Sequence, residues 1–386
     1  MAVRFDKLGV IIAALAAYAV LVAPFAAFRA NRIVAGEAKS ILQALPPAAG
    51  YALLAIIFVA ALIGLLRTRT LTKLLASLAA LGGLAVFLGV AASHLTPAEN
   101  TYARVSPASG FWLLLFAFCL LLAQAVSQLR PPPYLRVALL LAAAAGIGAI
   151  LLSGQWSDLS ILKEYASRED TFWSEAGRHV TLALGSLLAA AAVGLPLGIL
   201  CHRVGALRAG VLNVLNIIQT IPSIALFGLL IAPLGWIAAN VPGAAAIGIR
   251  GIGVAPAFVA LFLYSLLPVV ANTVVGLGGV PRETYEAARG LGMTGSQRLM
   301  RIEIPLAFPV ILTGIRIVLV QNIGLATIAA LIGGGGFGVF VFQGIGQTAM
   351  DLVLLGAVPT VALAFAAAIV LDALTEMMAK QRGRNA

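Results

Sequence analysis

Residues 278–305 read GGVPRETYEAARGLGMTGSQRLMRIEIP, a polar stretch between two long apolar segments. Pro281 suits the start of a helix, and Glu283 then lies in the first turn, near the positive end of the helix dipole. Gly290 and Gly292 favour the end of that helix, because glycine readily adopts the left-handed backbone found at helix C-termini. We therefore expect a short helix that begins at Pro281 and ends at these glycines.

A second short helix is expected directly after the glycines. Thr294 and Gln297 have the spacing of a capping box, in which two side chains and two backbone N–H groups bond reciprocally. Pro305 is expected to separate this helix from the apolar segment that follows. The stretch thus predicts a helix–glycine–helix elbow. Its small residues allow another protein to approach closely, and its Glu and Arg side chains can pair across an interface.

Composition places this elbow in a membrane protein. Of the 386 residues, 61% are hydrophobic and 10% are charged, and the mean hydropathy is +1.05. A soluble domain carries about 25% charged residues, so lipid must be the solvent for most of this chain. Cys119 and Cys201 lie in apolar stretches, and His94, His179 and His202 lack ligand spacing. Neither a disulfide framework nor a metal site is predicted.

Ten apolar segments are long enough to cross the ~30 Å hydrocarbon core of a bilayer as helices. They are Leu8–Phe28, Ala48–Leu66, Leu74–Ala92, Phe111–Ser127, Val137–Ser153, His179–Cys201, Val211–Ile231, Pro256–Gly276, Phe308–Ile332 and Leu352–Leu374. A retained helix is favoured over a signal peptide for the first segment, because its apolar run exceeds the roughly 7–15 residues of a signal core. The predicted fold class is therefore an all-α polytopic membrane protein with about ten transmembrane helices.

Basic residues predict the orientation. The formal charge of +11 is dispersed in short loops, which favours a topology signal over a nucleic-acid interface. With the N-terminus in the cytoplasm, about sixteen Lys and Arg fall inside and about eight outside, as the positive-inside rule requires. The inside set is Arg4, Lys7, Arg67, Arg69, Lys73, Arg130, Arg136, Arg203, Arg208, Arg282, Arg289, Arg298, Arg301, Lys380, Arg382 and Arg384. The outside set is Arg29, Arg32, Lys39, Arg104, Lys163, Arg168, Arg178 and Arg250. Both termini and the elbow are therefore expected in the cytoplasm.

The polar content of the segments divides the chain into four parts. Residues 1–153 predict an N-terminal bundle of about five plain apolar spans. Residues 154–178 carry aromatic side chains among charges outside the membrane, and either an amphipathic surface helix or a simple linker fits them. Residues 179–376 hold spans with many polar side chains, which mark a bundle interior or a path. Residues 377–386 predict a basic cytoplasmic tail.

Polar residues of the second half are candidates for a substrate path. The six candidates are Gln219, Pro222, Tyr264, Asn272, Gln321 and Asn322. Arg316 is a charge inside an apolar segment; it is either functional, or it snorkels or pairs with the acids of the elbow. The run from Gly333 to Gly338 formally fits a dinucleotide motif, but no strand precedes it, so a glycine-rich turn outside the membrane is expected.

The elbow resembles the EAA loop of ABC-importer permeases. That pattern is Glu-Ala-Ala, three residues, Gly, nine residues, and Ile-x-Leu-Pro. The matching residues, which the resemblance implies to be the ATPase-coupling residues, are Glu286, Ala287, Ala288, Gly292, Ile302 and Pro305. The one departure is Ile304 at the Leu position, which is an apolar exchange.

The resemblance extends over about residues 172–374. Residues 217–223, 260–268 and 331–338 resemble the osmoprotectant branch of that family, which imports glycine betaine, choline, proline betaine and related solutes. It implies an ABC transmembrane type-1 permease domain over residues 179–376, which imports such solutes by alternating access. The extra N-terminal spans are similar to those of a subgroup of these permeases, and no role is implied for them.

The resemblance also implies partners in a cell inner membrane. These are an ABC ATPase pair, a second permease copy or a sister permease, and an extracytoplasmic solute-binding protein. ATP and Mg would bind to the ATPase, since this sequence contains no P-loop pattern. The chain is therefore expected to be a lipid-embedded permease, with no enzymatic activity, cofactor or nucleic-acid partner of its own.

Two other functions stay open. An ion-coupled secondary transporter usually needs buried Asp, Glu or His. The spans of the second half hold none at mid-depth, and Asp351, Asp372 and Glu376 lie near segment ends. An ABC permease for a different small polar solute would share the same elbow.

Overall fold

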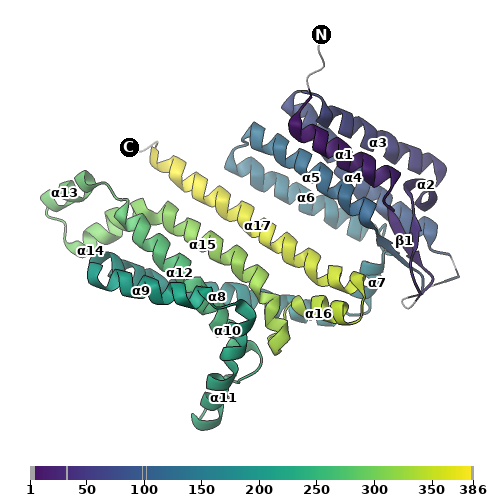
Figure 1. The fold of residues 1–386 in the computed structure, drawn as a ribbon. Helices are drawn as coiled ribbons and strands as arrows, with labels where there is room; N and C mark the ends of the chain where they lie inside the picture. Colours follow the sequence, from purple (N-terminus) through teal and green to yellow (C-terminus); the bar gives the residue numbers. More distant parts are fainter. Residues whose placement is uncertain (1–4, 32–33, 98, 101, 384–386) are drawn as a thin grey trace. The chain divides into compact units, whose positions relative to one another are not determined.

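The computed structural model describes residues 5–31, 34–97, 99–100 and 102–383, without the side chains of residues 379–383 (Figure 1). Arg4, Arg32 and Arg384 of the charge count lie outside the described residues, as do the side chains of Lys380 and Arg382. The chain forms two compact units, Met1–Ser167 and Arg168–Ala386, called below the N-terminal and the C-terminal unit.

Within the described residues, nine helices are long and apolar enough to cross a membrane. Their bounds are Pro47–Leu65, Thr70–Leu95, Ser109–Leu129, Pro133–Leu152, Glu169–Arg203, Ser223–Asn240, Val254–Gly278, Gly295–Ala326 and Met350–Met378. They confirm the predicted all-α polytopic class. Two of the ten expected spans, Leu8–Phe28 and Val211–Ile231, differ from the structure.

The first expected span, Leu8–Phe28, is wrong in its second half. Helix α1 covers Lys7–Leu21, and its 15 residues are short for a crossing. Strand β1 follows at Ala26–Arg29. The chain leaves the helix before Pro24, because proline has no N–H to continue the helical hydrogen bonds. Apolar composition alone could not predict this end.

Three longer helices and α1 form the core of the N-terminal unit. They are α3 (Pro47–Leu65), α4 (Thr70–Leu95) and α5 (Ser109–Leu129). Helix α6 (Pro133–Leu152) belongs to the same unit but contributes no residue to this core. Ile12, Leu53, Leu84 and Phe118 are fully buried where α1, α3, α4 and α5 meet. An antiparallel sheet, in the order β2-β1-β3, lies at the ends of these helices. Its other strands are β2 (Glu37–Lys39) and β3 (Arg104–Pro107), and the short helices nearby are α2 (Ile41–Ala44) and α7 (Ser160–Ala166).

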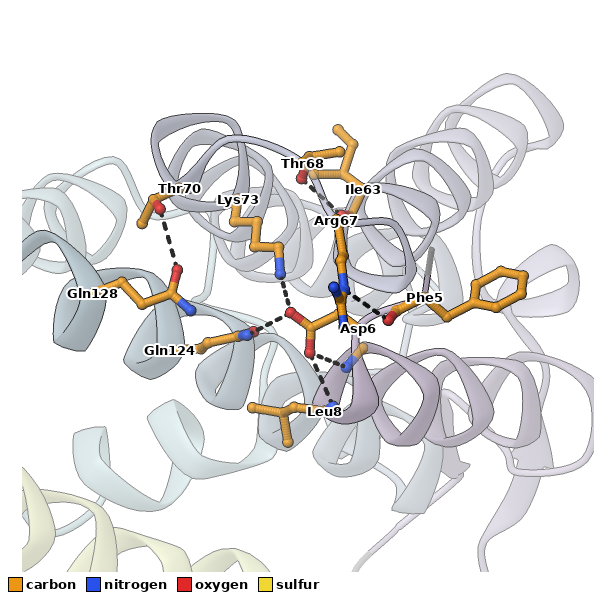
Figure 2. A network of polar contacts seen from close by, with 11 residues as sticks. Phe5, Asp6, Leu8, Ile63, Arg67, Thr68, Thr70, Lys73, Gln124 and Gln128 are labelled. Carbon is orange, nitrogen blue, oxygen red and sulfur yellow. Dashed lines mark hydrogen bonds and ion pairs between the residues drawn. The ribbon is translucent and has the colours of Figure 1, made fainter. Parts of the chain in front are cut away.

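A polar network around Asp6 ties three helices of this unit together (Figure 2). Asp6 caps α1, where its carboxylate accepts the backbone N–H of Leu8 at 3.0 Å. It also accepts the Lys73 ammonium of α4 at 2.5 Å and the Gln124 amide of α5 at 2.8 Å. The Lys73 hydrogen bond is the largest cause that lowers the pKa of Asp6 to about 2. The network therefore contributes to stability only while Asp6 is ionised.

Asp6→Asn is expected to lower the stability of the solubilised protein at pH 6 by about 1–3 kcal/mol, because the buried Lys73 ammonium loses its counter-charge. Since the pKa of Asp6 is lowered in the folded protein, the stabilisation is present above about pH 4 and is lost as the pH falls through about 2. The difference between the melting temperatures of variant and wild type should therefore shrink over that window. Glu37→Gln, at the exposed Glu37–Lys39 pair, is the control and should change little. Equal effects of both substitutions would contradict this account.

The C-terminal unit is built around helix α12 (Val254–Gly278), which packs against α8 (Glu169–Arg203) and α15 (Ile304–Ala326). Gly194 and Gly198 of α8 lie directly against α12. A Cβ at Gly194 would lie 2.8 Å from Val269, and one at Gly198 would lie 2.6 Å from Thr273. Their missing side chains let α8 and α12 approach closely.

The remaining elements of this unit lie around these three helices. They are α9 (Gly205–Thr220), α10 (Ser223–Leu229), α11 (Ile231–Asn240), α13 (Arg282–Gly290), α14 (Gly295–Arg298), the π-helical turn Leu299–Glu303, the 3₁₀ turn Ile328–Ile332, α16 (Gly338–Gly346) and α17 (Met350–Gly383). Figure 1 shows α13 and α14 together at one end of α12 and α15.

Two further expectations differ from the structure. The expected span Val211–Ile231 is broken, because Ile221 has an extended backbone before Pro222, which caps α10. Proline disfavours the helical conformation of the residue before it, which explains the break. Within 154–178, where a surface helix or a linker was expected, α7 occupies Ser160–Ala166 and α8 already begins at Glu169.

Candidate functional site: the elbow and the helices it joins

The first arm of the elbow forms as its sequence predicts. Helix α13 runs from Arg282 to Gly290 with Pro281 at its N-cap. Gly292 has φ +74°, the left-handed conformation that favours glycine. Its N–H bonds the Arg289 carbonyl at 3.0 Å. The chain can therefore reverse within a few residues.

The second arm confirms the predicted capping box and corrects the role of Pro305. The Gln297 N–H bonds the Thr294 hydroxyl at 3.3 Å, and the Thr294 N–H bonds the Gln297 side chain at 2.8 Å. Pro305 lies in the first turn of α15 and does not interrupt it. The preceding π-helical turn, in which the Ile304 N–H bonds the Leu299 carbonyl, leads into the proline without a break. Residues 295–326 are thus one continuous helical segment.

Arg298 locks the two arms against each other. Its guanidinium donates to the Met293 carbonyl at 2.8 Å and to the Tyr285 hydroxyl at 3.2 Å. It also lies 4.8 Å from the centre of the Tyr285 ring, within the range of a cation–π contact. The elbow is therefore a stiff unit, in which a force on α13 reaches α14 and α15.

The structure distributes the six motif residues over both faces of the elbow. Glu286 and Ala287 are exposed, and Glu286 pairs with Arg282 at 2.7 Å. Ala288 is buried, while Ile302 and Pro305 are half-buried. The elbow thus presents one small, charged face to the outside and packs the other.

Leu291 is a residue of the elbow that the sequence reasoning missed. Its side chain is 84% exposed at the turn between the arms, outside the apolar spans. Met300, 63% exposed, adds a second apolar group on the following arm. The available signal was a large apolar residue between two glycines of a polar loop. An exposed apolar tip of this kind fits a protein interface.

An ion pair between α8 and the elbow was also not predicted. Glu303, in the π-helical turn, is 2% exposed, and both of its carboxylate oxygens lie 2.8 Å from Nη2 of Arg203. Arg203 is the last residue of α8. The signal was an acid within an otherwise apolar Ile-Glu-Ile sequence, but its partner lies 100 residues away.

Three of the predicted path residues meet at the break between α9 and α10. The Gln219 amide donates to the Tyr264 carbonyl at 2.8 Å, and the Tyr264 hydroxyl donates to the Ile221 carbonyl. Pro222 follows directly and is exposed. These reciprocal bonds hold the broken helix to α12. The bond from Tyr264 also satisfies the Ile221 carbonyl, which the break leaves without a helical partner.

Asn322 lies in a contact between three helices and is fully buried. Its amide donates at 2.9 Å to the hydroxyls of Ser186 on α8 and Ser265 on α12. Both serines also bond a carbonyl of their own helix. The structure thus places Asn322 between helices and away from any surface open to a solute.

The other two path candidates lie apart from this cluster. The half-buried Asn272 donates to the Pro268 carbonyl at 2.8 Å and packs against Gly314 of α15. Gln321 is half-buried beside Asn322. Arg316 pairs with Asp372 of α17, and not with the acids of the elbow as one of its expected roles had it.

The glycine-rich run forms a turn that α8 holds. The Gly336 N–H donates to Glu175 at 2.6 Å, and the Phe337 N–H donates to Nδ1 of His179 at 3.3 Å. Gly335 has φ +77°, and a Cβ there would lie 2.6 Å from the Glu175 carboxylate. Both acceptors are buried. The close approach therefore requires glycine, which explains the composition of the run.

Comparisons with known proteins match the two halves of the chain to two different families. Residues 6–162 match the family described as ABC transporter permease YehY, N-terminal domain. Residues 194–382 match the family described as binding-protein-dependent transport system inner membrane component. The osmoprotectant import permease protein OsmW of Salmonella typhimurium is 46% identical over 195 residues, which cover 50% of this chain and 84% of that protein. The chain belongs to the family of binding-protein-dependent transport permeases.

Further relatives of this permease were found among curated proteins and solved structures. The glycine betaine/carnitine/choline transport system permease protein OpuCB of Bacillus subtilis is 36% identical over 209 residues, 54% of this chain and 88% of that protein. A chain of the MetNI methionine ABC transporter, in an inward-facing conformation, is 21% identical with a TM-score of 0.48 and covers 54% of this permease and 96% of that chain. The family match over residues 194–382 contains the whole elbow. The permease identity predicted from the elbow is confirmed.

Proposed function

We propose that this permease forms part of an ATP-driven importer of small osmoprotectant solutes such as glycine betaine or choline. The observation that carries the proposal is the elbow, inside the stretch that matches the permease family. The names of OsmW and OpuCB support the solute class. The permease would sit in a cell inner membrane, with both termini and the elbow in the cytoplasm.

The elbow is the part of the permease that an ABC ATPase would bind. Its outward face offers Glu286 and Ala287 beside the exposed Leu291, a small and partly apolar surface with charges at its edge. An apolar centre with a polar rim is the usual composition of a protein interface. ATP and Mg would bind to a pair of these ATPase subunits. Closure of the pair would push the elbow, and alternating access would follow as rigid-body movement of the helices.

The other partners follow from the same role. A second copy of the chain, or a sister permease, would complete the pathway, and an extracytoplasmic binding protein would deliver the solute. High selectivity would belong to that binding protein, because a pathway that bound the solute tightly would release it slowly.

Deletion of the gene is expected to abolish uptake of labelled glycine betaine or choline at raised osmolarity, and a plasmid copy should restore it. Proline, which lacks a quaternary ammonium group, serves as the comparison solute in the same cells. Unchanged uptake of all three solutes would remove the osmoprotectant assignment.

The energy source separates this proposal from ion-coupled transport. A protonophore that collapses the proton gradient while ATP is maintained should leave uptake largely intact. Loss of uptake under that condition would favour the ion-coupled alternative.

A further inference from the structure

Helix α8 has a polar attachment near each of its ends. At its C-terminus, Arg203 holds Glu303 of the elbow. Near the other end, Glu175 and His179 hold the backbone N–H groups of Gly336 and Phe337. Arg203 follows Glu175 by 28 positions, which corresponds to about 42 Å along the helix at 1.5 Å per residue. One helix thus connects the elbow with the glycine-rich turn.

The attachment at the elbow resists separation. Glu303 is 2% exposed, so its carboxylate is removed from water and depends on Arg203 for compensation. A buried charge that loses its partner is strongly destabilising. Any displacement of the π-helical turn must therefore carry Arg203, and with it the end of α8. Without this ion pair, the displacement would reach only α15, because α15 directly follows the π-helical turn in the chain.

The attachment at the glycine-rich turn is equally specific. The turn offers two backbone donors to two buried acceptors on one face of α8, four residues apart. Gly335 lies so close to the Glu175 carboxylate that the turn cannot shift over α8 without breaking these bonds. A movement of α8 along or about its axis therefore acts directly on the turn and on α16, which begins at Gly338.

We propose that Arg203 and Glu303 form the joint through which a displacement of the elbow reaches α8, and that α8 transmits it to the glycine-rich turn at residues 333–338. The inference rests on the proposed function, in which an ATPase moves the elbow. Arg203 and Glu303 are positioning residues: they touch neither solute nor nucleotide. The joint links the ATPase side of the permease to its opposite side.

The test uses the whole importer, which is the permease with its ATPase and binding protein, reconstituted in proteoliposomes. Glycine betaine is added on the side of the binding protein, and ATP is supplied on the side of the ATPase. Glu303→Gln removes the charge and keeps the size of the side chain. Solute uptake should fall at least about tenfold, the effect of a lost charged hydrogen bond. ATP hydrolysis should fall by much less, so that more ATP is consumed per solute moved. A variant that only folds poorly would lose both activities together.

Two further variants complete the design. The exchange Arg203→Glu with Glu303→Arg restores opposite charges at the joint and should recover part of the uptake that is lost when either of these two substitutions is made alone. Arg208→Gln, which removes an exposed charge of nearby α9, is the control and should behave as wild type. If Glu303→Gln is present in the complex at the wild-type amount and keeps the wild-type ratio of uptake to ATP hydrolysis, the joint is refuted and the proposed function stands. If the wild-type complex shows no ATP-driven uptake, the proposed function itself fails.

Discussion

Gly292→Asp is expected to reduce solute uptake to background while the permease remains in the membrane. Gly292 lies at the turn of the elbow with φ +74°, and a Cβ built there meets no atom within 4 Å. The substitution therefore causes no clash inside the chain. Asp tolerates the left-handed conformation better than most residues, so its effect must come from a new charge beside the apolar Leu291, on the face proposed to contact the ATPase.

Two matched variants separate the charge from the backbone. Gly292→Asn has the same shape as Asp without the charge and should keep most of the uptake. Gly292→Val has no charge but is strained by about 1–2 kcal/mol in the left-handed conformation, and it should lose a large part of the uptake through distortion of the turn. The measurements are uptake, permease content of the membrane, and co-purification with the ATPase. Wild-type uptake by the Asp variant would disprove the docking role of this turn.

Asn322→Asp is expected to prevent accumulation of the folded permease. The Asn322 side chain is fully buried between α8, α12 and α15. A carboxylate at such a depth costs at least about 2.5–3.5 kcal/mol, and no cationic side chain is among its hydrogen-bond partners Ser186 and Ser265. Membrane content, measured by immunoblot, should fall sharply.

Asn322→Leu tests what Asn322 does. Leu removes the interhelical hydrogen bonds of Asn322 to α8 and α12, of about 0.6 kcal/mol each, and the serines keep their bonds to their own helices. The melting temperature should therefore fall by a few degrees, and uptake per folded molecule should be unchanged. The sequence alone suggested a contact with solute, and in that case uptake would fall while stability changed little. The two outcomes distinguish a helix contact from a path residue.

The elbow was predictable because each of its features depends on residues within one or two turns. The capping box of Thr294 and Gln297 needs only a spacing of three residues, and the reversal at Gly292 needs only a residue that tolerates positive φ. The role of Pro305 was predicted wrongly for a local reason too. A proline in the first helical turn lacks a hydrogen bond that this position does not need, and the π-helical turn before it absorbs the change in register.

Two helix ends were predicted wrongly because they depend on tertiary contacts, which a hydropathy pattern cannot show. The apolar run 8–28 continues beyond α1, yet β1 pairs with β2 and β3 and draws the last residues into a sheet. At the break before Pro222, the Tyr264 hydroxyl and the Gln219 amide supply hydrogen bonds that make an interrupted helix tolerable. Proline alone does not require such a break, because α8 continues through Pro196.

The sequence by itself determined that this is a helical membrane permease with a helix–glycine–helix elbow, since hydropathy, capping and motif spacing are properties of neighbouring residues. Only the tertiary structure decided which polar groups meet. Glu303 and Arg203, Arg316 and Asp372, and Glu175 and Gly336 come from segments far apart in the chain. The physical reason is that a buried charge must find a partner wherever packing brings one, and helix packing depends on side-chain shapes along whole helices.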